Sequence, residues 1–234
     1  VIIIDDMGHH LSRGRDALAL PGKLNFAVIP YTRYGTELAD AAHRSGKEVL
    51  LHAPMSTLEQ DSLGQGGLTA ELSREEFRAT LDAALEQVPH VRGINNHMGS
   101  DLTQRRPQMA WLMQELRWRE MYFVDSRTSD KTVAATVAGE FNVPHLSRHV
   151  FLDNERDTKA IDARFQEMLA LAERDGIAVA IGHPYPETIN YLRKALLTVH
   201  DRGMRPVFIS EVLEGIAPET LAGISSSATA SPGC

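Results

Sequence analysis

Val-Ile-Ile-Ile-Asp-Asp, residues 1–6, is a short apolar run that ends in two carboxylates. The same arrangement recurs along the chain: Val49-Leu50-Leu51 precedes His52, Gly93-Ile94-Asn95-Asn96 precedes His97, Tyr122-Phe123-Val124 precedes Asp125, and residues 177–182 precede His183. Each run has the length and composition of a buried strand. The carboxyl ends of the strands in a parallel barrel meet on one face, where such enzymes hold their active sites. The pattern predicts a barrel with one site built from these acids and histidines.

Strand-like runs alternate with longer amphipathic stretches over most of the chain. We expect strands at 1–5, 24–29, 48–52, 92–97, 121–125, 146–151, 177–182 and 206–210, and helices at 35–45, 73–88, 106–118, 130–140, 157–174 and 186–202. Most of these strands are continuously apolar, as is typical of a parallel sheet covered by helices. This order favours a distorted α/β barrel of seven or eight parallel strands. An open doubly wound sheet is the alternative, but no Gly-x-Gly-x-x-Gly follows the first strand.

The length and composition suit one such barrel. A chain of 234 residues is long for an average domain and matches a single α/β barrel. We expect residues 1–215 to form this domain. Residues 216–234, rich in Ser and Ala, are expected to be a flexible low-complexity tail.

Several functional classes are excluded by composition. The formal net charge of −7, without any block of Lys or Arg, argues against nucleic-acid binding. The single cysteine, Cys234, excludes both a disulfide and a cysteine-based zinc site within the chain. The chain contains no apolar run of about 18 residues, the length that a membrane-spanning helix needs. The chain starts inside a strand without Met or a signal segment, which suggests a trimmed fragment.

The residue types at the strand ends are those of a catalytic metal site. One carboxylate of the pair Asp5-Asp6 and the neutral imidazoles of His52 and His97 leave positions open on a divalent cation. The other carboxylate is then available to accept a proton or to hold a water. Alternatively, each aspartate caps the following helix and each histidine is an ordinary core residue.

Two further strand ends carry proton-transfer groups. His183 stands between Gly182 and Pro184, in a segment that prolines stiffen, and is suited to a general acid. Asp125 is expected either to orient such a histidine or to cap the helix near residue 130. The long loop at 56–72 is expected to line a substrate site.

These motifs, in this order, resemble the divergent polysaccharide deacetylase family. The resemblance rests on Ile-Ile-Asp-Asp at 3–6, Leu-His-Ala-Pro-Met at 51–55, Gly-Ile-Asn-Asn-His-Met-Gly-Ser at 93–100, Val-Asp-Ser at 124–126 and Ile-Gly-His-Pro at 181–184. It spans roughly residues 1–215 and implies a distorted barrel with a divalent metal, usually zinc. The broader carbohydrate esterases, to which this family is related, remove acetyl groups from glycans. Relatives are typically exported to the bacterial envelope, which implies a periplasmic or envelope location.

The resemblance also implies roles for individual residues. Asp5 corresponds to the catalytic base, Asp6 and His52 to metal ligands, and His183 to the final catalytic histidine. The broader family has a second histidine ligand four residues after the first, where this chain has Ser56. The Arg-x-Pro-Tyr motif of the broader family is also absent from the fourth strand. We therefore expect His97 to supply the missing ligand, and Asn96, Ser56 and Tyr185 to contact a carbohydrate substrate.

The sequence thus predicts a metal-dependent hydrolase that removes acyl groups from a carbohydrate or a cell-envelope polysaccharide. An alternative is a glycan-binding protein of deacetylase descent with little or no turnover. A third candidate is another metal hydrolase, such as an amidase or a phosphoesterase, for which Arg127 and Arg148 are the placed cations.

Overall fold

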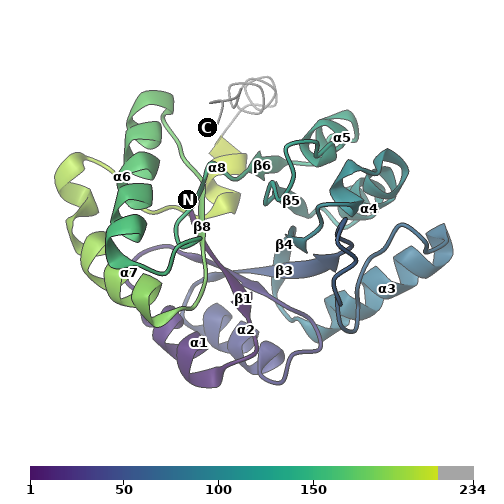
Figure 1. The fold of residues 1–234 in the computed structure, drawn as a ribbon, viewed down its shortest axis with the longest axis horizontal. Helices are drawn as coiled ribbons and strands as arrows, with labels where there is room; N and C mark the ends of the chain where they lie inside the picture. Colours follow the sequence, from purple (N-terminus) through teal and green to yellow (C-terminus); the bar gives the residue numbers. More distant parts are fainter. Residues whose placement is uncertain (216–234) are drawn as a thin grey trace.

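Eight parallel strands form a single curled sheet in the computed structural model, which describes residues 1–215 (Figure 1). The strands are β1 (Ile2–Met7), β2 (Asn25–Val28), β3 (Glu48–Met55), β4 (Val91–Met98), β5 (Tyr122–Asp125), β6 (His145–Ser147), β7 (Val150–Phe151) and β8 (Ala180–Gly182). Their order in the sheet is β6-β5-β4-β3-β2-β1-β8-β7. The predicted α/β fold with a distorted barrel of parallel strands is confirmed.

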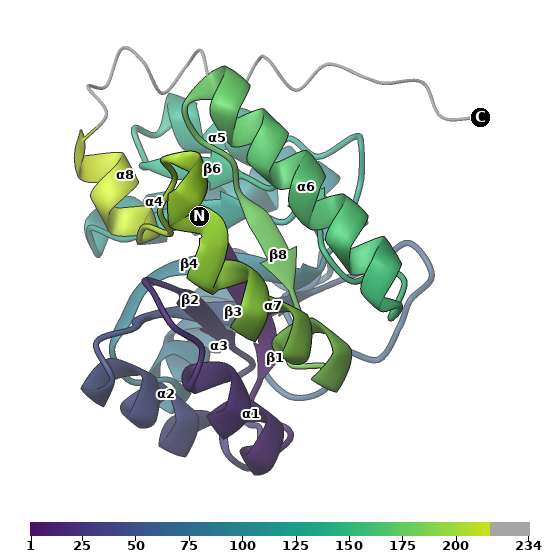
Figure 2. The same cartoon turned by 90° about the vertical axis from the view of Figure 1, so that its left-hand side faces the viewer.

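The helices cover the outside of this sheet, except the last one, which packs against the inner cluster of strand residues (Figures 1 and 2). They are α1 (Leu11–Leu18), α2 (Gly35–Arg44), α3 (Arg74–Gln87), α4 (Arg106–Trp118), α5 (Ala134–Glu140), α6 (Thr158–Asp175), α7 (Pro186–Thr198) and α8 (Ile209–Gly215), with short 3-10 helices at Leu102–Gln104 and Val199–Arg202. Ser73 caps α3 in a reciprocal capping box with Glu76, as its sequence indicates. Helix α1 was not predicted, and α5 begins four residues later than expected.

Both faces of the sheet are apolar. Alternate strand residues point to opposite sides, and both sets of residues are apolar. Ile4, Phe26 and Leu51 pack outward in the cluster shared with the helices. Ile3, Leu50 and Ile181 belong to a second cluster made only of strand residues, residues flanking them and the segment 207–213. Apolar residues on both sides explain why the strands read as continuous hydrophobic runs.

The two edge strands of the curled sheet are consecutive in the chain. The predicted strand at 146–151 is therefore wrong as a single element, because it splits into β6 on one edge and β7 on the other. Between them, the amide of Arg148 donates to the Asp125 carbonyl at 2.9 Å, and the amide of His149 donates to the Val179 carbonyl at 2.8 Å. These two residues span the seam of the barrel.

The predicted strand at 206–210 is also wrong. This apolar run enters the amino-terminal end of the barrel and continues into α8. Ile209 is fully buried in the inner cluster, and its amide donates to Oδ1 of Asn25 at 3.1 Å. The amide of Ser210 donates to Oε1 of Glu48, which also accepts the hydroxyl of Tyr122 at 2.7 Å. Side chains thus satisfy backbone groups that a strand would have paired in a ladder.

Among residues 1–215, no helix combines the length and the apolar content needed to cross a bilayer. The tail predicted at 216–234 lies outside the described residues.

Candidate metal centre

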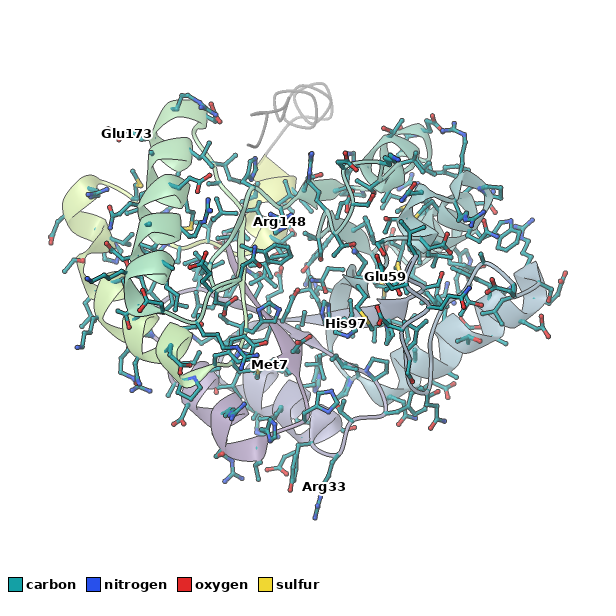
Figure 3. The ribbon with its side chains drawn as sticks, viewed as in Figure 1. Met7, Arg33, Glu59, His97, Arg148 and Glu173 are labelled. Carbon is teal, nitrogen blue, oxygen red and sulfur yellow. The ribbon has the colours of Figure 1, made fainter. Side chains whose placement is uncertain are left out.

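Asp6, His52 and His97 converge at the carboxyl ends of β1, β3 and β4. Oδ1 of Asp6 lies 3.0 Å from Nδ1 of His97 and 3.3 Å from Nε2 of His52. The two ring nitrogens are 3.1 Å apart. Figure 3 labels His97 and Met7, the residue that follows Asp6. Three ligand atoms therefore face one small volume, as the sequence predicts.

Asp5 and Asp6 both reach this volume because the strand geometry changes between them. Consecutive residues of a regular strand point to opposite faces. Asp6 adopts a left-handed backbone with φ of 54°, and the register of β1 against β2 shifts between Ile4 and Met7. As a result, Oδ2 of Asp5 lies 3.6 Å from Nε2 of His52, on the same side as Asp6.

Oδ1 of Asp6 is buried and has no hydrogen-bond partner among the described residues. Its short distances to the two imidazoles lack hydrogen-bond geometry. Burial alone would raise the pKa of Asp6, but the nearby His52 and His97 outweigh it and hold the pKa well below its usual range. An ionised, buried and unsatisfied oxygen beside two ring nitrogens is the environment that a divalent cation completes.

Asn95, which the sequence-based prediction missed, supports the cluster from β4. Its Nδ2 donates to Oδ1 of Asp5 at 2.9 Å, and its Oδ1 lies 2.9 Å from Nδ1 of His52. The available signal was strand alternation, because Asn95 and His97 lie two residues apart and share a face. Asn95 also pairs in register with His52.

Asn96, which was predicted to bind substrate, lies on the other face of the strand. Its side chain accepts the amide of Ser126 at 2.8 Å and donates to the Met98 carbonyl at 2.7 Å. It is almost fully buried. The polar groups of Asn96 therefore hold the segments that follow β4 and β5.

His183 approaches the cluster from the end of β8. Its Nε2 lies 3.9 Å from Oδ2 of Asp6, and its Nδ1 lies 2.8 Å from Oδ1 of Asp153. Burial would lower the pKa of His183, but the bond to Asp153 and the charges of Asp153, Asp5 and Asp6 raise it to about 9. Asp153 was not predicted, although it follows the run Val150–Leu152 as the other site acids follow theirs.

Asp125 has no bond to His183. Its Oδ1 accepts the amide of Arg127 at 2.8 Å, and its Oδ2 accepts the hydroxyl of Thr132 at 2.9 Å. The carboxylate thus closes the loop before α5. It neither orients His183 nor caps a helix, because α5 begins at Ala134 without a side-chain cap. Burial raises the pKa of Asp125.

Ser56 and Tyr185 border the cluster without joining it. The Ser56 hydroxyl donates to Oδ2 of Asp101 at 2.9 Å, at one end of a hollow of about 630 Å³ that the loop at 56–71 lines. The ring of Tyr185 lies 5.3 Å from that of His183 and is covered by the guanidinium of Arg156 at 3.6 Å. Both positions are compatible with contact to a bound substrate.

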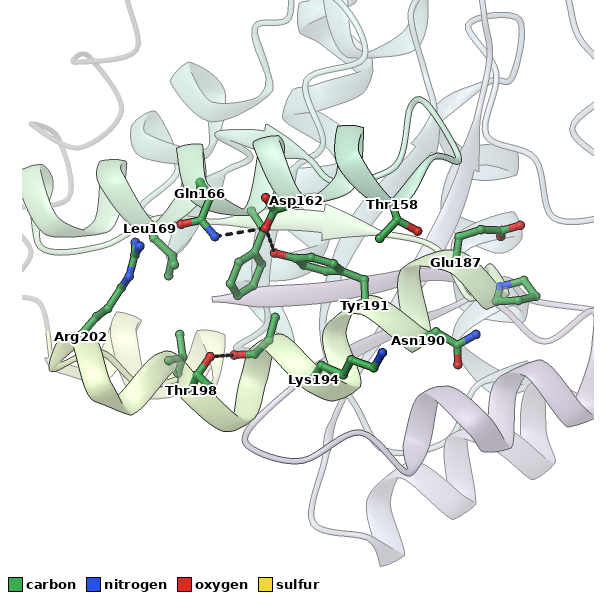
Figure 4. Close-up of a pocket in the computed structure, with 14 residues that line it drawn as sticks. Thr158, Asp162, Gln166, Leu169, Glu187, Asn190, Tyr191, Lys194, Thr198 and Arg202 are labelled. Atoms are coloured by element: carbon green, nitrogen blue, oxygen red, sulfur yellow. Dashed lines mark hydrogen bonds between the residues drawn. The ribbon is translucent and has the colours of Figure 1, made fainter.

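A separate hollow of about 660 Å³ lies between α6 and α7 (Figure 4). Asp162 and Tyr191 hydrogen-bond across it at 2.6 Å. It contains none of the strand-end acids and histidines, so we do not assign the chemistry to it.

Comparison with known proteins agrees with this geometry. A sequence model described as divergent polysaccharide deacetylase matches residues 2–213. The uncharacterized protein YibQ of Escherichia coli (strain K12) is 38% identical over 193 residues, which make up 82% of this chain and 60% of that protein. An uncharacterized protein of Haemophilus influenzae is 35% identical over 195 residues, 83% of this chain and 70% of its own length. The chain thus spans less than two thirds of the Escherichia coli relative.

One solved structure establishes the fold independently. The crystal structure of the uncharacterized protein ATU2773 from Agrobacterium tumefaciens C58 matches with a TM-score of 0.87, covering 91% of this chain and 87% of that one at 20% identity. The resemblance drawn from the strand-end motifs is confirmed by the match to the family model over nearly the whole chain. This chain belongs to the divergent polysaccharide deacetylase family.

Proposed function

We propose that this protein is a metal-dependent hydrolase that removes acyl groups, most simply acetyl, from a carbohydrate or a cell-envelope polysaccharide. The observation that carries the proposal is Oδ1 of Asp6, a buried carboxylate oxygen without a hydrogen bond. It lies within 3.3 Å of ring nitrogens from His52 and His97. Two groups that could transfer protons, Asp5 and His183, lie next to this cluster.

The donor set fits a catalytic zinc ion. Zinc in catalytic sites takes three protein ligands from histidine and carboxylate side chains and leaves a position for water or substrate. Asp6, His52 and His97 would hold the ion through one oxygen and two nitrogens. When bound, zinc polarises a carbonyl and lowers the pKa of water from about 15.7 to about 7.

Asp5 would act as the base in this proposal. Its Oδ1 is fixed by Asn95, which leaves Oδ2 facing the cluster. Burial raises the pKa of this carboxyl, despite the opposing effects of His52, His183 and Asn95. A raised pKa brings a carboxylate closer to the pH at which it accepts a proton efficiently.

His183 would act as the acid, because its Nε2 lies 3.9 Å from Oδ2 of Asp6. Asp153 holds Nδ1, so Nε2 faces the cluster. A pKa of about 9 keeps this imidazole protonated at neutral pH, as donation to a leaving amine or alcohol requires. Base and acid therefore approach the same volume from β1 and β8.

A second candidate function is glycan binding with little or no turnover. Ser56 favours this candidate. The broader carbohydrate esterases have a histidine ligand at this position, whereas Ser56 has a hydroxyl that is bonded to Asp101. With Ser56 engaged in this way, the ion depends on His97 as its third ligand.

Metal analysis combined with acetate release tests both candidates. We expect the purified protein to bind one zinc ion and to release acetate from an acetylated chito-oligosaccharide. His97→Ala should lose the ion, and His183→Ala should keep it while lowering kcat by about 100- to 10,000-fold. His200→Ala, on an exposed side chain remote from the strand ends, is the control.

Three results would each contradict one part of this proposal. If neither His52→Ala nor His97→Ala lowers the bound metal, the site is wrong. If the oligosaccharide binds but no acetate appears with zinc, cobalt, nickel or manganese, the protein is a binding protein. If His183→Ala retains full turnover, the acid has been misassigned.

A further inference from the structure

The amide of Asn95 connects the proposed base to a proposed metal ligand. Its Nδ2 lies 2.9 Å from Oδ1 of Asp5, and its Oδ1 lies 2.9 Å from Nδ1 of His52. All three side chains are almost completely buried. No water is needed to complete this chain of contacts, since each distance is that of a direct hydrogen bond.

The direction of each hydrogen bond follows from the chemistry of the groups. An ionised carboxylate only accepts, so the NH₂ group of Asn95 faces Asp5 and its carbonyl oxygen faces His52. That oxygen also only accepts, so Nδ1 of His52 carries a hydrogen. In the neutral imidazole, Nε2 then bears the lone pair. Nε2 is the nitrogen that lies 3.3 Å from Oδ1 of Asp6.

We propose that Asn95 is a positioning residue that fixes the metal-binding tautomer of His52 and the orientation of Asp5 at the same time. The part concerning Asp5 rests on the proposed hydrolase function, whereas the part concerning His52 requires only the cluster. An amide performs both tasks because it has a donor side and an acceptor side. Alanine removes both contacts, and aspartate keeps the acceptor for His52 while placing a second carboxylate against Asp5.

A matched control exists at the other end of the sheet. Asn25 is also fully buried, and its side chain makes two hydrogen bonds. These bonds go to the Ile2 carbonyl at 3.0 Å and to the amide of Ile209 at 3.1 Å. Asn25→Ala therefore measures how much stability is lost when a buried amide is removed, without changing any contact of the cluster.

The test compares Asn95→Ala, Asn95→Asp and Asn25→Ala with the wild type. Nitrogen NMR of the metal-free protein, at an alkaline pH where the imidazole is neutral, reports the His52 tautomer. Competition titration reports zinc affinity, and acetate release reports kcat. We expect Asn95→Ala to lose the single Nδ1–H tautomer and to weaken zinc binding by about 10- to 100-fold. Asn95→Asp should keep both the tautomer and the zinc affinity but lower kcat by about 10-fold or more. Asn25→Ala should lower only the thermal midpoint.

The inference is overturned if Asn95→Ala leaves the tautomer and the zinc affinity at wild-type values, as Asn25→Ala should. Wild-type turnover in Asn95→Asp would overturn the part concerning Asp5. If the wild type binds zinc without releasing acetate, the proposed hydrolysis fails while the tautomer and affinity measurements still decide the role of Asn95 toward His52. If the wild type binds no zinc, the proposed function fails as a whole, and the NMR comparison alone decides this role.

Discussion

Nδ1 of His183 lies 2.8 Å from Oδ1 of Asp153, and Oδ2 of the same carboxylate accepts the amide of His183 at 2.7 Å and the hydroxyl of Thr188 at 2.6 Å. One buried aspartate therefore fixes both the backbone and the ring of the proposed acid. Because Nδ1 is held, Nε2 is the nitrogen left to face Asp6. This relationship makes the protonation of His183 dependent on Asp153.

Asp153→Asn should lower the pKa of His183 in the metal-free protein from about 9 toward or below its ordinary value. Burial already disfavours the charged imidazole, and the substitution removes the main charge that offsets burial. Proton NMR of the histidine ring measures this change. Asp157→Asn, at the exposed cap of α6, is the control and should leave the pKa of His183 unchanged. An unchanged pKa in Asp153→Asn would contradict the assignment.

The same pair makes stability depend on pH. The folded-state pKa of His183 is raised, so its stabilisation is fully present below the unfolded pKa near 6.5 and is lost as pH rises through about 9. Asp153→Asn should therefore cost more at pH 6 than at pH 10, by at most about 3 kcal/mol. Urea unfolding of metal-free protein at the two pH values tests the sign, and equal losses would refute it.

Zinc should raise the thermal midpoint of the protein through Asp6, His52 and His97. A ligand at a free concentration of 100 times its Kd stabilises the native state by about 2.7 kcal/mol. Thermal unfolding with added zinc, and again after chelation, measures the effect. His97→Ala should abolish it. Ser56→Ala should retain the stabilisation by zinc, because the Ser56 hydroxyl bonds to Asp101 rather than to the cluster. Loss of this stabilisation in Ser56→Ala would mean that Ser56 is a zinc ligand.

Gly93→Ala should destabilise the protein by about 3 kcal/mol or more, at the upper end of overpacking costs. A Cβ at Gly93 would lie 2.2 Å from the ring of Tyr122, and that ring is held by Glu48 through its hydroxyl. Gly139→Ala in α5 meets only His145, at 3.7 Å, and should stabilise by about 0.5–1 kcal/mol. Chemical denaturation of the two variants measures the contrast, and losses of similar size would argue against the close approach at Gly93.

Ile209→Ala should cost about 2–5 kcal/mol of unfolding free energy without changing zinc affinity. Its side chain fills the amino-terminal end of the barrel, whereas the cluster occupies the carboxyl end. Denaturant titration and zinc titration measure the two quantities separately. A coupled loss of zinc affinity would mean that the segment 207–213 also shapes the metal centre.

Local sequence patterns predicted most of the fold because the interactions behind them are local. Continuous apolar runs identified β1, β3 and β5, since strands buried on both faces have no polar side. The capping box of Ser73 and Glu76 at the start of α3 is also a local interaction, since it is completed within four residues. The predictions of single strands at 146–151 and 206–210 were wrong. An apolar run of this length suits one strand, two short edge strands or a segment that fills the end of a barrel, and only the closure of the sheet distinguishes these cases.

The composition of the candidate site followed from the sequence, and its geometry did not. Strand ends supplied Asp5, Asp6, His52, His97 and His183, because parallel topology brings carboxyl ends to one face whatever the details. Asn95 and Asp153 were missed, since an amide or acid that supports another side chain has no signature apart from the residue it touches. We expected Asn96 to contact the substrate, but Asn95 is the residue that faces the cluster. The two neighbours point to opposite faces because side chains alternate along a strand.

The sequence by itself determined that acids and histidines would collect at one end of a parallel α/β sheet, because hydrophobic periodicity and chain order suffice for that. Only the tertiary structure decided which atoms meet. The left-handed backbone at Asp6 turns two consecutive carboxylates to the same side, and β4 brings Asn95 and His97 into register beside His52. These contacts join residues up to 90 positions apart, and their distances depend on the twist and register of the whole sheet rather than on any local preference.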